Sequence, residues 1–182
     1  MNNFPMTTRH LLECTACIGV RVCSADSLPK NTLRANSTII CNLARLSDPP
    51  GDSPYRHWIL FHLDSDRKMF IFDSLNMYLM RDDHFSFVEK NAKKIIRCNK
   101  RCQGNFSVVC GHYCVMLAHF LANRVSPEAF LDLFSSSTRA NDAKVLNWVS
   151  ENFGKINPRG GGQACRSFKS RKSSFPSQKP RG

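Results

Sequence analysis

Several features of membrane and secreted proteins are missing from this sequence. No apolar run approaches the roughly 18 residues that a membrane-spanning helix needs. The first nine residues lack the basic-then-apolar pattern of a secretory signal. We therefore expect an intracellular protein with no membrane partner, whose nine cysteines are thiols rather than a disulfide framework.

Acidic residues are also scarce. The 182-residue chain has 14 Asp and Glu against 26 Lys and Arg, so its formal net charge is +12. Residues 155–182 contain eight of the basic residues, no acidic residue and many glycines, serines and prolines. Such a segment buries too little apolar surface to offset its ordering entropy. The sequence predicts one folded domain over residues 1–154 and a disordered basic tail over 155–182, which either aids solubility or contacts nucleic acid.

A second group of basic residues recurs at helical spacing inside the domain. Apolar residues from Phe85 to Ile96 lie opposite them, so the pattern predicts an amphipathic helix over residues 84–99. A solvated helix face explains these charges without a ligand, but six cations beside one acid also suit an anionic partner such as DNA. The basic residues are Lys90, Lys93, Lys94, Arg97, Lys100 and Arg101.

The remaining pattern predicts a small sheet and several helices. Residues 57–63 and 68–73 are rich in β-branched and aromatic residues and are joined by four polar residues, which is typical of a β-hairpin. Both strands are apolar on both faces, so helices should cover the sheet. Helices are predicted over residues 110–123, 126–134 and 141–153. The expected fold class is α+β, with a small, mostly antiparallel sheet flanked by helices.

The predicted hairpin brings a histidine and an aspartate together. His57 begins the first strand and Asp73 ends the second, so they should be cross-strand or diagonal neighbours with Cβ atoms about 5–8 Å apart. At that separation the carboxylate can hold the Nδ1–H of the imidazole. This arrangement provides a base and the group that orients it.

Cys110 opens the most apolar predicted helix, where the positive end of the helix dipole stabilises a thiolate. Gly111 follows and permits close backbone approach. Gln103 offers an amide donor seven residues earlier, and the first N–H groups of the helix offer more. Cysteine, histidine, aspartate and a polar donor together fill the roles of a cysteine acyl-transfer site.

At these residues the sequence resembles the adenovirus-type cysteine endopeptidases. This is the adenain group with its relatives in polinton-like and adintovirus-like elements, within the clan of ubiquitin-like-protein proteases. The resemblance covers about residues 15–125 and rests on four roles in the order His, Asp, Gln, Cys. The matching residues are His57-Trp58, Asp73, Gln103-Gly104 and Cys110-Gly111.

The resemblance implies a role for each matching residue. His57 would be the general base, Asp73 its orienter, Cys110 the nucleophile at the start of a buried central helix, and Gln103 a donor in the oxyanion hole. Trp58 would shield the site, which Gly111 would help to shape. Adenovirus enzymes usually have Glu where this chain has Asp73, but other members of the clan use Asp.

The expected function is therefore that of a monomeric viral cysteine endopeptidase. It would mature virion or capsid precursors in the host nucleus or the virion, cutting after small residues, typically glycine. The sequence requires no cofactor, although the resemblance implies activation by DNA and a viral peptide; the interval before Gln103 differs from the adenovirus form. Two alternatives remain: a ubiquitin-like-protein deconjugating protease, and a basic nucleic-acid-binding structural protein with a protease-like fold. Cys14-x-x-Cys17 lacks a second ligand pair, so no metal site is expected.

Overall fold

Five strands and several helices make up the residues that the computed structural model describes, which are 4–49, 56–77 and 80–154. The strands are β1 (Arg21–Ser24), β2 (Ser37–Asn42), β3 (Trp58–Leu63), β4 (Lys68–Phe72) and β5 (Lys94–Arg97). The helices are α1 (Thr8–Thr15), α2 (Asp82–Asn91), α3 (Cys110–Ala122), α4 (Pro127–Leu131) and α5 (Thr138–Phe153), with 3₁₀ helices η1 (Ala16–Ile18) and η2 (Ala25–Lys30). The predicted α+β fold class is confirmed.

The strands form one mixed sheet in the order β1-β2-β3-β4-β5. The predicted hairpin is present as β3 and β4, and β2 is also antiparallel to β3. The two edge strands, however, run parallel to their neighbours, so "mostly antiparallel" describes only the centre of the sheet. In the hairpin Leu63 lies opposite Met69, and Leu60 lies opposite Phe72.

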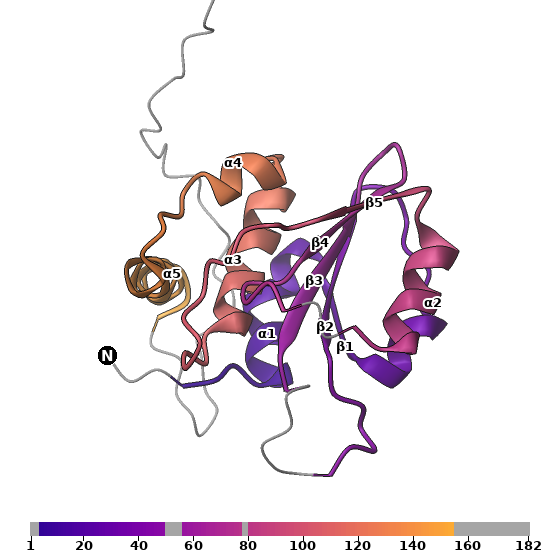
Figure 1. The fold of residues 1–182 in the computed structure, drawn as a ribbon, viewed down its shortest axis with the longest axis horizontal. Helices are drawn as coiled ribbons and strands as arrows, with labels where there is room; N and C mark the ends of the chain where they lie inside the picture. The colour runs from indigo at the N-terminus through magenta and orange to yellow at the C-terminus, as the bar shows by residue number, and fades with distance from the viewer. Residues whose placement is uncertain (1–3, 50–55, 78–79, 155–182) are drawn as a thin grey trace, which may run out of the picture.

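Helices cover both faces of the sheet, as the apolar strands predicted. In Figure 1, α1, α3, α4 and α5 lie on one face, and α2 with η2 lies on the other. Successive side chains of β3 point to opposite faces of the sheet. Leu60 packs in the core beneath α3, and Ile59 and Phe61 pack in the core beneath α2. Each such side chain contributes about 1.5–3 kcal/mol on burial.

Helix α3 is the central helix of its layer. It begins at Cys110 as predicted, and ten of its residues from Cys110 to His119 are buried. Helix α4 is capped by the Ser126 hydroxyl as expected but ends at Leu131, and α5 begins at Thr138, three residues earlier than predicted. The start of α3 therefore lies deep between the sheet and the other helices.

The predicted helix over residues 84–99 is wrong in its second half. Helix α2 ends at Asn91, whose buried amide accepts from the Leu33 N–H and donates to the Phe87 carbonyl. The chain then turns extended, and Lys94–Arg97 pairs with β4 as edge strand β5. Over a segment as short as residues 94–97, the apolar pattern of a helix cannot be told from that of a strand. Pairing with β4 therefore determines that this segment is a strand.

The basic tail predicted over residues 155–182 lies outside the described residues. Within the described part of the chain, no helix combines the length and apolar character that crossing a membrane requires.

Candidate active site

His57 and Asp73 meet at one end of the central hairpin. His57 directly precedes β3, Asp73 directly follows β4, and both side chains are buried. The His57 Nε2 lies 2.7 Å from the Asp73 Oδ1. The predicted proximity therefore holds, but the carboxylate contacts Nε2 and not the expected Nδ1. Because a carboxylate only accepts, this contact places the ring proton on Nε2 and leaves Nδ1 as the acceptor.

The Asp73 carboxylate is itself fixed by the turn that follows β4. Its Oδ1 accepts the N–H of Leu75 at 2.9 Å, and its Oδ2 accepts the N–H of Met77 at 2.8 Å. Asn76 supports this turn with a left-handed backbone, φ 55°. Both oxygens are thus held, so the carboxylate presents a fixed edge to the imidazole.

Cys110 lies on the other side of the same imidazole. The thiol lies close enough to the His57 ring to help raise its pKa, and because Nε2 contacts Asp73, the nitrogen open to the thiol is Nδ1. Burial alone would lower the pKa of His57, but the hydrogen bonds to Asp73 and Cys110 and the charges of both groups outweigh it and raise the pKa to about 9. The raised pKa makes His57 a stronger base than a free imidazole.

Gly111 and Trp58 lie against the N-terminal segment at the start of α3. A Cβ on Gly111 would come within 2.8 Å of the Met6 Cβ and 3.4 Å of the Trp58 Cδ1. The Trp58 indole N–H donates to the Met6 carbonyl at 3.0 Å. Only glycine leaves room for this packing, so Trp58 and Met6 together cover the first turn of the helix.

Gln103 lies beside the residue that follows Asp73. Its side chain is buried, its Oε1 accepts from the Ser74 hydroxyl at 2.7 Å, and its Nε2 donates to the Ser107 carbonyl at 2.6 Å. Sequence reasoning missed Ser74, because a serine after a strand is unremarkable. Its position next to Asp73 was the available indication.

The six basic residues do not lie on one helix. Lys90 lies on α2, whereas Lys93 precedes β5, and Lys94 and Arg97 are exposed on it. The Lys100 ammonium donates to the carbonyls of Leu131 and Phe134 at the end of α4, and the Arg101 guanidinium donates to the Gln103 carbonyl. The single basic helix face that was expected to contact DNA is therefore not formed. Its charges are divided between α2, the edge strand β5, and Lys100 and Arg101, which bind backbone carbonyls.

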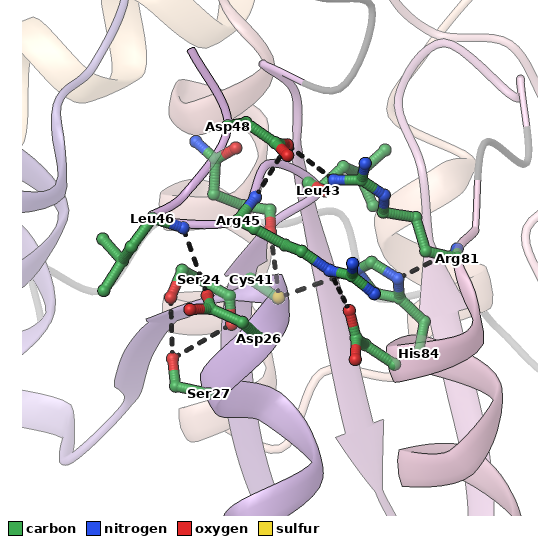
Figure 2. A network of polar contacts seen from close by, with 12 residues as sticks. Ser24, Asp26, Ser27, Cys41, Leu43, Arg45, Leu46, Asp48, Arg81 and His84 are labelled. Atoms are coloured by element: carbon green, nitrogen blue, oxygen red, sulfur yellow. Dashed lines mark hydrogen bonds and ion pairs between the residues drawn. The ribbon is translucent and has the colours of Figure 1, made fainter. Parts of the chain in front are cut away.

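A second thiol–imidazole pair lies on the opposite face of the sheet (Figure 2). The Cys41 Sγ is 3.8 Å from the His84 Nε2, and the Arg81 backbone N–H donates to the His84 Nδ1 at 3.1 Å. Burial lowers the pKa of His84 to about 4 and raises that of Cys41 well above its ordinary value. Two ion pairs, Arg45–Asp83 and Arg81–Asp48, surround this pair.

Within the described residues, no group of three or more His, Cys, Asp and Glu side chains is arranged to hold a metal ion. The donors at the candidate site are instead the imidazole, thiol, carboxylate and amide already described.

Solved structures of other proteins share this fold. Two structures of ChlaDub1 from Chlamydia trachomatis each match 81% of this chain. The first is 12% identical, with 90% of its own chain covered and a TM-score of 0.51. The second is 11% identical, with 83% of its own chain covered and a TM-score of 0.52. A structure of the effector Cdu1 bound to ubiquitin, also from Chlamydia trachomatis, matches 52% of this chain and 46% of that chain at 19% identity, with TM-score 0.39. No protein-family model and no curated protein sequence matches the chain. The chain therefore shares the fold of the ChlaDub1 structures.

Proposed function

We propose that this protein is a cysteine endopeptidase with Cys110 as its nucleophile. The observation that supports the proposal is the buried His57 imidazole, which contacts the Asp73 carboxylate and whose pKa both Asp73 and Cys110 help to raise, with Cys110 at the start of the central helix α3. A thiol, a base and a fixed carboxylate in this order can generate and use a thiolate.

The reaction follows from the atoms present. His57 takes the thiol proton, and the Cys110 sulfur adds to the scissile carbonyl carbon. The Gln103 amide and the first N–H groups of α3 donate to the resulting oxyanion. His57 returns the proton to the leaving amine as the C–N bond breaks and a thioester remains. Water, deprotonated by His57, then hydrolyses the thioester and restores the thiol.

The proposed substrates are viral virion or capsid precursors with small residues, typically glycine, just before the cut. The sequence resemblance to adenovirus-type endopeptidases supports this substrate class. The same resemblance supports the small residues before the cut. Action as a monomer in the host nucleus or virion, activation by DNA or a viral peptide, and DNA contact through the basic residues belong to the same proposal; the net charge of +12 supports the DNA contact.

A second candidate is a protease that removes ubiquitin or a ubiquitin-like protein. The observation that favours it is the match to ChlaDub1, a deubiquitinase, over 81% of this chain. Both candidates use the same site and differ in the substrate that they cleave. A substrate comparison therefore separates them.

The test uses the full chain on three substrates: a panel of Gly-Gly-containing peptides, a viral capsid precursor with such a junction, and ubiquitin carrying a C-terminal fluorophore. Each is measured with and without duplex DNA. Cys110→Ala should lower cleavage by at least about 10³-fold while the thermal unfolding midpoint stays close to that of the wild type. Cys41→Ala, which removes the other thiol beside a histidine, should keep its activity.

Preference for the precursor and peptides would support the endopeptidase, and preference for ubiquitin would support the deconjugating protease. Equal activity in the wild type and Cys110→Ala, including none in either, would contradict both. Activity in neither protein would leave the basic nucleic-acid-binding structural protein as the explanation, whereas equal activity in both would reject Cys110 as the nucleophile.

A further inference from the structure

Ser74 contacts the candidate oxyanion donor and directly follows the residue that orients the base. Its side chain is fully buried, and its hydroxyl lies 2.7 Å from the Gln103 Oε1. We propose that Ser74 is a positioning residue, which holds the Gln103 amide so that its nitrogen faces the scissile carbonyl. The proposal rests on the proposed function, because it needs Gln103 to be the oxyanion donor.

The hydrogen bonds fix which end of the Gln103 amide faces which way. The Ser107 carbonyl can only accept, so the group 2.6 Å from it must be the amide nitrogen. The amide oxygen then faces Ser74, whose hydroxyl must donate. The nitrogen carries two N–H groups; one is directed at Ser107, and the other is the group that can donate to an oxyanion.

Ser74 also fixes the backbone of this segment. Its carbonyl accepts the N–H groups of both Cys102 and Gln103, each at 2.9 Å. From the other side, the Tyr113 hydroxyl and the Asn141 amide donate to the Cys102 carbonyl at 3.0 and 3.1 Å. With the backbone held on both sides, the remaining freedom of Gln103 is rotation of its side chain, and the Ser74 hydroxyl restricts that rotation.

The end of β4 therefore aligns both halves of the reaction. Asp73 fixes the imidazole that moves the proton, and Ser74 fixes the amide that stabilises the negative charge. Without the Ser74 hydroxyl, the buried Gln103 Oε1 would lose its hydrogen-bond donor, and the amide would rotate to find another donor. This rotation would raise the free energy of the transition state, where the oxyanion forms, and would leave substrate binding unchanged.

The test compares Ser74→Ala with the wild type on the substrate that the wild type cleaves. We expect kcat to fall about tenfold with KM little changed, which is less than the loss of a whole oxyanion donor. The rate at which iodoacetamide modifies Cys110, followed by mass spectrometry, and the pH profile of that rate should stay as in the wild type, because Asp73 and His57 are untouched. Ser74→Cys, a weaker donor of similar shape, should fall between the two.

A double-mutant comparison makes the test specific. In a Gln103→Ala background, Ser74→Ala should cause no further loss, since the amide that it positions is gone. Thr15→Ala serves as the matched control: it removes another buried hydroxyl, which bonds the Leu11 carbonyl in α1, and should leave kcat unchanged.

Three results would overturn the role of Ser74 while the wild type still cleaves through Cys110. They are an unchanged kcat in both Ser74 variants, equal losses in kcat and in the Cys110 modification rate, or additive losses with Gln103→Ala. Wild-type protein no more active than Cys110→Ala would instead reject the proposed function, and the role of Ser74 with it.

Discussion

Two thiol–imidazole pairs lie on opposite sides of the sheet, and they differ in what stands behind each imidazole. Behind His57 is the Asp73 carboxylate on Nε2, so the proton sits there and Nδ1 can accept the Cys110 proton. Behind His84 is the Arg81 backbone N–H on Nδ1, so the neutral ring carries its proton on Nε2, directed at Cys41. One imidazole can take a proton from sulfur; the other can only donate to it.

The pKa values follow the same division. The pKa of His57 is raised to about 9, whereas burial lowers the pKa of His84 to about 4 against the opposing charge of Asp83. The Arg81–His84 bond caps the start of α2, so this histidine has a structural task. Proximity of cysteine and histidine is thus insufficient for a nucleophile, and the third group determines what the pair can do.

The largest expected effect comes from removing the carboxylate behind His57. Asp73→Asn keeps the shape but removes the charge, so the His57 pKa should fall from about 9 and cleavage should fall on the order of 10³-fold. Histidine NMR titration and steady-state kinetics measure the two changes. Asp83→Asn is the matched control, because its carboxylate lies near His84 and pairs with Arg45.

Asp83→Asn should leave cleavage unchanged and lower the His84 pKa further, since the Asp83 charge now opposes that shift. Full activity in Asp73→Asn, or equal losses in the two variants, would break the distinction between the pairs.

This distinction was only partly accessible from the sequence. The hairpin was predictable because its apolar, β-branched strands are bounded by polar residues, and it brought His57 and Asp73 together. The start of α3 at Cys110 was predictable because this helix is the most apolar segment of the chain. The choice between Nε2 and Nδ1 was not, because it depends on the rotation of a ring that packing determines.

Other features depended on contacts between distant residues. The helix expected over residues 84–99 stops where Asn91 binds the Leu33 N–H, 58 residues away, and β5 forms because β4 offers an edge. Ser74 could be recognised only once Gln103 lay beside it. Local periodicity carries no information on such pairings, which is why these elements were wrong or missed.

His84 and His57 should change the free energy of unfolding at opposite ends of the pH range. The pKa of His84 is lowered in the folded protein, so its contribution is present above about pH 6.5 and is lost as the pH falls through 4. The pKa of His57 is raised, so its contribution is present below about pH 6.5 and is lost as the pH rises through 9. Each spans about 3 kcal/mol at most.

Urea unfolding of His84→Asn and His57→Asn between pH 4 and 9 measures these contributions. The first variant should flatten the acid side of the stability curve and the second the alkaline side. Buried His112, with its pKa also lowered to about 4, keeps part of the acid slope in both variants. Flattening on the same side in both would contradict the opposite shifts.

The smallest expected effect concerns the ion pairs around His84. Arg45 and Asp83 are 2.7 Å apart, but the Arg45 side chain is 41% exposed, so water and salt screen the pair. Arg45→Gln should shift the thermal unfolding midpoint by roughly 2 °C or less, with no change in cleavage. High salt should shrink that shift, whereas the effect of Asp73→Asn on cleavage should persist, because the His57–Asp73 pair is buried. A large, salt-independent loss in Arg45→Gln would mean that the network of Figure 2 does more than support α2.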